Sequence, residues 1–518
     1  MRVALRAAPS AAVAVLLVFL LLVIARLPWA GDLGMHAATI ERLRHDLLRP
    51  GNPLVDADTP SPYYSPWMVV LGCLARVTGA SVFVVLRIAA VAGLGLLVTG
   101  VWRYVRTLSP HRAAPALALV CLLFLWGPQL FAWSGFLGLN SLALTVSYPS
   151  VFALGLAFHL WAWLARAVGR TNRGWGVWAG LGVLWAAILL CHQFSGVVAS
   201  LGALAVVAAA RPPGVVWRRL GAGLLVGMVV LWVWPYYDFF ALFGAGGELE
   251  SVHRGLYRDL AGRFGLVLVG VVALGLRWWR DRWDPLVLFF VSAVAVFVAG
   301  GVTGHWSWGR VLPGVVIPAQ VAAAVEAVGA VGAVGAVGAV GVVGVGRTTE
   351  VRARGVRRER WWRVGWGCVL AGALGVGAWA QVGTVGYVVG RGALPGVVEA
   401  RYREPWVGYH WITPWVRYGD VVMARTGAAR QIPAYGAYTV APGYPDFFLP
   451  DEGRREVAVR RYFDVGTSVG ERREIVRGYG VRWVVDRGVG AGAGVWRGAG
   501  LRVVARGPGG QVLYAVVP

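Results

Sequence analysis

Apolar runs long enough, or nearly long enough, to cross a bilayer recur along almost the whole chain. Crossing ~30 Å of hydrocarbon takes about 20 helical residues, because each residue advances the helix axis by about 1.5 Å. With 58% of residues hydrophobic and 14% charged, a soluble fold could not bury so much apolar surface. The sequence therefore predicts about eleven transmembrane helices, over residues 8–24, 82–102, 114–133, 149–165, 175–190, 195–210, 220–236, 264–276, 285–301, 311–346 and 364–385.

Arginines are distributed unevenly among the loops between these runs. They gather in alternate loops, and the short loops in between are nearly free of them. The basic loops hold Arg103, Arg106 and Arg112; Arg166, Arg170 and Arg173; Arg211, Arg218 and Arg219; Arg277, Arg280 and Arg282; and a dense group from Arg347 to Arg363. Because positive residues beside membrane helices favour the cytoplasmic side, we expect a multi-pass protein of the plasma membrane with its N-terminus inside and its C-terminus outside.

The net charge of +24 would suit a nucleic-acid-binding protein if it formed one continuous surface. Here the charge is divided among loops between apolar runs, so we expect no nucleic-acid partner. The dense basic loop at residues 347–363 instead favours contact with anionic membrane lipid.

Two segments outside the apolar runs are long. Residues 27–81 form the first outer loop, with an amphipathic helical pattern at 38–48 and a short apolar helix at 65–79 that we place at the membrane interface. Residues 390–518 are polar, with strand-like runs at 479–487 and 500–507 separated by Gly and Pro turns. The predicted architecture is an all-α polytopic membrane domain, residues 1–389, followed by a small α/β extracytoplasmic domain, residues 390–518.

The first outer loop opens with three residues that could take part in chemistry, Asp32, His36 and Glu41. Asp32 lies between Gly31 and Gly34, and glycines allow a backbone to turn sharply or approach a ligand closely. A carboxylate at the membrane surface can act as a general base on a hydroxyl group. An ordinary solvated acid in a juxtamembrane loop is the alternative interpretation.

Further along the same loop, Asp56 and Asp58 are two residues apart. Oxygen ligands at this spacing can hold a divalent cation, although Asp, Pro and Ser are also the residues of ordinary turns. A cation is therefore one expectation and a turn the other. Tyr63 and Tyr64 follow, either as the wall of a sugar-sized pocket or as aromatic residues of the membrane interface.

Two polar residues lie at the expected outer ends of later spans. His192 ends the run at 175–190, where a polar group is costly and tends to face a cavity, unless its role is structural. Arg310 lies among Trp306 and Trp308 on the side where arginine is otherwise scarce. Its fork of donors would match phosphate oxygens, and an interfacial arginine that extends its charge into water is the alternative.

The order of features from the first span to residue 94 resembles the GT-C superfamily of membrane glycosyltransferases. The resemblance rests on "GDLGMH" at 31–36, the amphipathic helix, "PSPYYSPW" at 60–67 and "VFVVLRIAAVAGL" at 82–94. It implies a catalytic acid in the first outer loop, matched here by Asp32, and a late arginine on the lipid phosphate, matched by Arg310. Many members carry a second acid beside the first, whereas Leu33 stands here, which leaves the need for a metal open.

The resemblance implies transfer of a sugar from a polyprenyl-phosphate-linked donor to an extracytoplasmic acceptor, which could be a cell-envelope glycan, lipid or protein. Asp32 would be the general base, and His36, Glu41, Tyr63, Tyr64, His192 and Arg310 would bind substrate. A transporter or flippase of a lipid-linked or polar solute, and a non-catalytic cell-envelope scaffold, are the alternatives. Convergence of Asp32, His192 and Arg310 on one site would favour the enzyme, whereas charged groups along a central path would favour transport.

Overall fold

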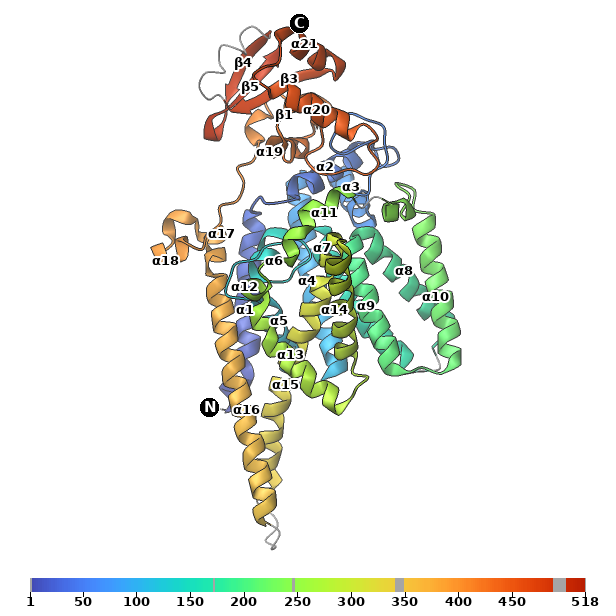
Figure 1. Cartoon of the computed structure of the whole chain (residues 1–518), viewed down its shortest axis with the longest axis vertical. Helices are drawn as coiled ribbons and strands as arrows, with labels where there is room; N and C mark the ends of the chain where they lie inside the picture. The colour runs from blue at the N-terminus through green and yellow to red at the C-terminus, as the bar shows by residue number, and fades with distance from the viewer. Residues whose placement is uncertain (1, 171–172, 245–246, 341–348, 488–499, 518) are drawn as a thin grey trace.

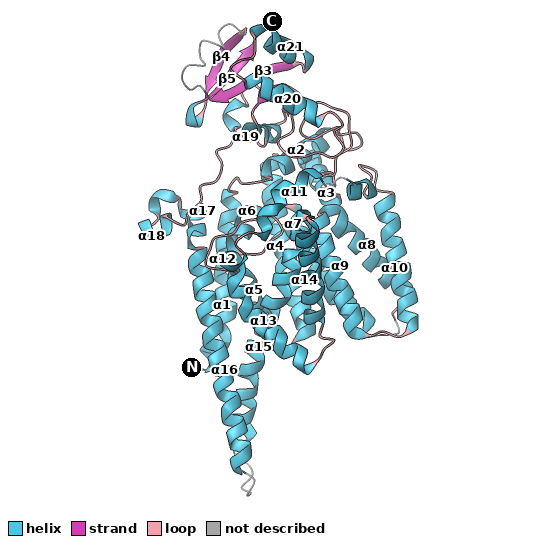
Figure 2. Cartoon of the chain, in the orientation of Figure 1, coloured by secondary structure: helices cyan, strands magenta, loops and turns pink. Residues whose placement is uncertain are grey.

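The computed structural model describes residues 2–170, 173–244, 247–340, 349–487 and 500–517. Long helices form one bundle, and a small sheet lies beyond one end of it (Figures 1 and 2). The long helices are α1 (Arg2–Arg26), α4 (Val82–Leu108), α7 (Pro149–Val168), α8 (Trp175–Cys191), α9 (Gln193–Ala210), α10 (Gly214–Trp232), α13 (Leu268–Arg280), α14 (Pro285–Thr303), α15 (Leu312–Val340) and α16 (Thr349–Ala380).

Within the described residues, eight helices are long and apolar enough to span a membrane, and nine if the pair Gly365–Ala380 and Val382–Val389, bent by 52°, is one span. The expected count of about eleven is thus not confirmed. The predicted span at 114–133 is wrong in extent: α5 (Ala114–Phe124) has 11 residues, and the chain leaves the helix before Gly127 and Pro128. A side chain at Gly127 would overlap the backbone of Gly262. The other short member is α8, with 17 residues.

The last two long helices differ from expectation at their ends. Residues 349–363, which we expected to be part of a basic loop, form the first turns of α16. Arginine and glutamate are strong helix formers, and this preference decides the local structure. The predicted end of the preceding span, at residue 346, lies outside the described residues. Together α15 and α16 extend beyond the other helices at the end far from the sheet (Figure 1).

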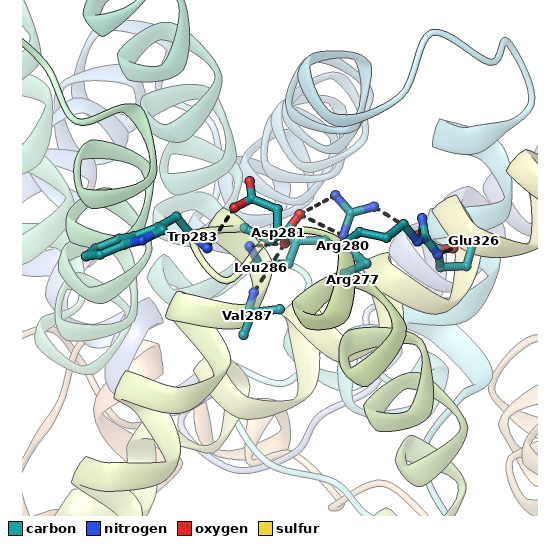
Figure 3. Close-up of polar contacts among 8 residues, drawn as sticks. Arg277, Arg280, Asp281, Trp283, Leu286, Val287 and Glu326 are labelled. Carbon is teal, nitrogen blue, oxygen red and sulfur yellow. Dashed lines mark hydrogen bonds and ion pairs between the residues drawn. The ribbon is translucent and has the colours of Figure 1, made fainter.

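An ion-pair network holds α13, α14 and α15 together at that same end (Figure 3). The Asp284 carboxylate accepts hydrogen bonds from the backbone of Leu286 (2.9 Å) at the start of α14 and from Arg277 (2.6 Å) at the end of α13. Glu326 of α15 pairs with Arg277 (3.2 Å) and with Arg280. The α13–α14 turn that carries these arginines lies at the end of the bundle far from the sheet (Figure 1), and the expected orientation in the membrane stays a prediction.

The first loop (residues 27–81) contains the two predicted helices, α2 (Leu33–His45) and α3 (Pro66–Thr78). The helix α2 ends at His45, three residues earlier than expected, because Asp46 accepts hydrogen bonds from the backbone of Leu48 and Arg49, both at 2.9 Å. This local turn competes with continuation of the helix. The expected place of α3 at the membrane interface stays a prediction.

The C-terminal region (residues 390–517) contains the predicted α/β fold. Its five strands have the order β2-β1-β3-β5-β4, in which β1 is parallel to β2 and β3, and β5 is antiparallel to β3 and β4. They are β1 (Val421–Ala424), β2 (Tyr438–Thr439), β3 (Val481–Arg487), β4 (Leu501–Arg506) and β5 (Gln511–Val516), with helices α20 (Glu452–Phe463) and α21 (Val469–Gly478). Buried apolar residues cover both faces of the sheet.

Arg42 of α2 fixes the first loop against the C-terminal region. It is fully buried and donates hydrogen bonds to the carbonyl oxygens of Gly436 (2.9 Å) and Ala437 (2.7 Å). Its guanidinium group also lies 3.6 Å from the centroid of the Tyr438 ring. The backbone carbonyls and the aromatic face together compensate for removing this charge from water.

The second half of the first loop reaches the edge of the sheet. The Thr439 backbone of β2 donates to Leu54 (2.9 Å), so the loop adds a short parallel bridge to the sheet. Asn52 donates to the buried carboxylate of Asp446 at 2.8 Å. The first loop and the C-terminal region thus form one packed unit above the bundle.

Candidate functional site

Asp32 lies at the start of α2, after a turn in which Leu27 and Gly31 have positive φ angles. An aspartate at this position usually caps the helix through its side chain. Asp32 does not: its side chain makes no capping bond, and its residue is only partly buried. Within the described part of the chain, no hydrogen bond reaches its carboxylate. The carboxylate has no structural partner and is accessible to a ligand.

Two tyrosines hold the backbone just before Asp32. Tyr444 of the C-terminal region donates to the carbonyl oxygen of Gly31 at 2.7 Å, and Tyr148, before α7, donates to that of Ala30. Both hydroxyl groups are therefore used by the main chain. The position of the Asp32 backbone is set by residues from two distant parts of the sequence.

The ionisation of Asp32 is governed by burial and by two arginines. Burial raises the pKa of the Asp32 carboxyl group above its ordinary value, while the positive charges of Arg310 and then Arg430 lower it. The two arginines come from the helical bundle and from the C-terminal region, respectively. A carboxylate with a raised pKa is a stronger base than a solvated aspartate, which suits it to accept a proton.

Arg310 is in a 3₁₀ turn, η4 (Trp306–Val311), at the start of α15, and is 7% exposed. Its guanidinium group lies 4.7 Å from the ring of Phe194, and its Nη2 lies 3.4 Å from Nε2 of His192. Its Nε and Nη1 have no hydrogen-bond partner among the described residues. Buried donors without an acceptor are costly, so this geometry indicates a site for an anion.

His192 contributes a further hydrogen-bond donor beside those of Arg310. The backbone N–H of Ser195 donates to Nδ1 of His192 at 3.1 Å, as part of the cap of α9. A neutral imidazole that accepts at Nδ1 carries its hydrogen on Nε2. The Nε2–H group and the Arg310 guanidinium then present two donors side by side, without an acceptor between them.

The loop after α5 brings Gly135 against this pair, which the sequence did not predict. Gly135 has φ +85°, and a methyl group there would lie 3.7 Å from the His192 ring and 3.9 Å from Nη2 of Arg310. The positive φ angle favours glycine here, and its lack of a side chain leaves nothing of Gly135 between its backbone and the two donors.

Arg430 is the second residue that sequence reasoning missed. It lies between α19 (Thr426–Ala429) and the 3₁₀ turn η8 (Ile432–Tyr435), close to the start of α2. A side chain on Gly34 would overlap its carbonyl oxygen, so the two segments are in direct backbone contact. No spacing or motif in the sequence distinguishes Arg430 from the other arginines of this region.

Of the other predicted residues, His36 follows Asp32 most closely in the sequence. It is one turn further along α2, with its ring 4.6 Å from that of Tyr148 in an edge contact. Burial lowers the pKa of His36 to about 3, so the ring is neutral. Glu41 lies further along α2 and pairs with His45 (3.2 Å) and Arg44 (3.7 Å), away from the site.

The two tyrosines of the first loop have structural partners. Tyr63 donates to the carbonyl oxygen of Pro445 at 2.6 Å, and Tyr64, fully buried, donates to that of Gly51 at 2.8 Å. Asp32 is one of the charges that raise the pKa of Tyr63, which places this residue in the surroundings of the site. Tyr64 instead belongs to the packing of the loop.

Asp56 and Asp58 are both exposed. In the part of the chain that the structure describes, no three His, Cys, Asp or Glu side chains are grouped as a metal ion requires. A divalent cation therefore stays a prediction.

No protein-family model matches the sequence, and no curated protein matches it. Solved structures do resemble the fold. ArnT from Cupriavidus metallidurans, bound to undecaprenyl phosphate, is 16% identical with a TM-score of 0.52, over 98% of this chain and 97% of ArnT. The arabinofuranosyltransferase AftD from Mycobacteria is also 16% identical, with a TM-score of 0.55, over 98% of this chain but 40% of AftD.

The TM-scores show that this chain shares a fold with ArnT and AftD, which are both GT-C membrane glycosyltransferases. The likeness in fold extends over nearly the whole chain. This protein has the fold of ArnT and AftD.

Proposed function

We propose that this protein is a membrane glycosyltransferase that moves a sugar from a polyprenyl-phosphate donor to an acceptor hydroxyl group outside the cytoplasm. One observation supports it above all others. An accessible carboxylate without a structural partner, Asp32, is coupled by charge to a buried arginine with unused donors, Arg310. ArnT, a protein of the same fold, binds undecaprenyl phosphate, which is the kind of lipid that the proposed donor would release on transfer.

In the proposed reaction, the donor phosphate binds Arg310 and the Nε2–H of His192. Asp32 accepts the proton of the acceptor hydroxyl group while the hydroxyl oxygen forms a bond to the sugar C1 atom. The C1–O bond to phosphate breaks, and its electron pair goes to the phosphate oxygen, with inversion at C1. Arg310 stabilises the charge that develops on the leaving phosphate, because a fixed cation in a water-poor site needs no reorganisation.

Transport is the alternative that the structure addresses most directly. A charged residue within the spans would suit a transport pathway, and Glu326 of α15 is such a residue. It pairs instead with Arg277 and Arg280 (Figure 3). The α13–α14 turn lies at the end of the bundle opposite α2 (Figure 1). This arrangement supports a structural role for Glu326 and favours the enzyme.

The test is incubation of the purified protein in detergent with a panel of labelled polyprenyl-phosphate sugars and an extract of envelope acceptors. We expect one donor to be consumed, with release of polyprenyl phosphate. Arg310→Gln should lower the rate about 10²–10³-fold, the usual effect of removing one charge-stabilising donor. Movement of an intact donor across proteoliposomes, without its consumption, would instead establish transport.

A further inference from the structure

Arg430 has a fixed position but an incompletely used guanidinium group. Its Nε donates to the carbonyl oxygen of Gly443 at 2.9 Å, and the group lies 5.4 Å from the ring of Tyr444. Among the described residues, no acceptor is found for its two Nη groups. Arg42 differs, since both of its Nη groups donate to backbone carbonyls. These contacts fix the orientation of the Arg430 guanidinium group and leave its Nη donors available.

The segment that contains Arg430 packs directly against the start of α2. The hydroxyl group of Tyr444 lies 2.7 Å from the carbonyl oxygen of Gly31 and 3.3 Å from that of Arg430, and so connects the two segments. Gly34 contacts the Arg430 backbone directly. Asp32 lies between Gly31 and Gly34, which places Arg430 beside the proposed base.

Two guanidinium groups, of Arg310 and Arg430, act on the carboxyl group of Asp32 and lower its pKa. Guanidinium donors left open beside such a group can bind an anion. Arginine is suited to this role because its planar fork matches the oxygens of phosphate and carboxylate groups.

We propose that Arg430 is a second anion-binding residue of this site, contributed by the C-terminal region and taking a phosphate or carboxylate group of a substrate. The identification of the site rests on the proposed function. The anion has two possible sources: the donor phosphate, held jointly with Arg310, or an acidic group of the acceptor. In both cases the C-terminal region forms one wall of the site.

Binding measurements on the full-length protein in detergent test this proposal. The variants are Arg430→Gln, Arg430→Lys and the control Arg502→Gln, which makes the same charge change at an exposed residue of β4, the strand furthest from β2. One probe is polyprenyl phosphate. The other is inorganic phosphate, added with polyprenyl phosphate already saturating. Thermal unfolding of each variant establishes that it is folded. Arg430→Lys keeps the positive charge and serves as the second variant if Arg430→Gln does not fold.

If the donor is the source, Arg430→Gln should weaken polyprenyl-phosphate binding about tenfold or more, as expected for a charged hydrogen bond. If the acceptor is the source, that affinity should stay the same, while binding of inorganic phosphate is weakened to a similar extent. Arg430→Lys should be intermediate, and Arg502→Gln should match the unchanged protein. Folded Arg430 variants with unchanged affinity for both probes would overturn the proposal. Absence of polyprenyl-phosphate binding in the unchanged protein would contradict the proposed function. The inorganic-phosphate measurement would then still test whether Arg430 binds an anion.

Discussion

Asp32 carries a cost in the folded protein, because burial raises the pKa of its carboxyl group. A raised pKa means that the folded state favours the protonated form. The contribution of this carboxyl group to the free energy of unfolding is therefore fully present below its ordinary pKa of 3.8. That contribution is lost as the pH rises through the higher pKa that the group has in the folded protein. At neutral pH the ionised carboxylate lowers stability, and functional residues often carry such a cost.

The pH dependence of transfer should follow the ionisation of Asp32. Since the base must be ionised, kcat/KM should fall on the acidic side, at a pH above 3.8. Arg430→Gln removes a charge that lowers the pKa of Asp32, so the acidic limb should move to higher pH. Arg430→Lys should leave the limb near its original place. Rates measured across pH at subsaturating donor check this, and an unmoved limb in Arg430→Gln would show that the two residues are not coupled.

At the scale of single residues, sequence reasoning found Asp32, His192 and Arg310 because each is unusual for its place in the topology. A polar or cationic group at the outer end of a span is costly and therefore informative. Arg430 lies among many arginines of a polar region, where another arginine costs nothing. Gly135 could not be predicted either, because its role depends on a fold that brings the loop after α5 to His192.

At the scale of elements, the closest backbone contact between α2 and the C-terminal region is made at a small residue, Gly34. A methyl group on Gly34 would overlap the carbonyl oxygen of Arg430. Because the methyl carbon is bonded directly to the Gly34 backbone and the oxygen belongs to the Arg430 backbone, neither can move without shifting a whole segment. The position of Asp32 relative to Arg430 should therefore be sensitive to this residue.

Gly34→Ala should lower the free energy of unfolding by about 1–3 kcal/mol, the usual cost of overpacking. Transfer should fall as well, since the base moves relative to Arg430. The matched control is Gly453→Ala in α20, where a methyl group meets nothing within 4 Å. Chemical unfolding in detergent micelles measures the free energy of unfolding of the two variants. Equal stability of the two variants would contradict the close packing of α2 against Arg430.

The ion pairs at the opposite end of the bundle provide the complementary prediction. Glu326→Gln weakens the pairs with Arg277 and Arg280 and should cost about 1–3 kcal/mol, the range for charged hydrogen bonds. The rate of transfer per folded molecule should stay the same, because the α13–α14 turn and α2, which begins beside Asp32, lie at opposite ends of the bundle (Figure 1). Loss of transfer at unchanged stability would instead indicate that Glu326 acts in the function.

Local signals predicted many elements but not all of their limits. The turn after α2 and the break after α5 arise from Asp46 and from Gly127 with Pro128, short-range features that a count of apolar residues overlooks. The start of α16 within a basic segment reflects helix propensity, which hydropathy does not measure. The runs of apolar residues set where helices lie, and local chemistry sets where they end.

At the scale of the whole molecule, hydropathy and the arginine distribution predicted a helical membrane protein with a small α/β region at its C-terminus. They could not predict that the first loop and the C-terminal region pack into one unit. That contact joins residues almost 400 positions apart, such as Arg42 and Ala437, which are 395 apart. No local pattern encodes such a pairing, although it builds one side of the proposed site.

The most direct test of the account is the rate of sugar transfer by Asp32→Asn. The variant keeps the shape of the side chain and removes its basicity, so transfer should fall about 10²–10⁴-fold, as for loss of a general base. It should unfold at the same temperature as the unchanged protein or higher, since a buried charge is removed, and it should still bind polyprenyl phosphate. A folded Asp32→Asn protein that transfers sugar at the original rate would contradict the assignment of Asp32 as the base.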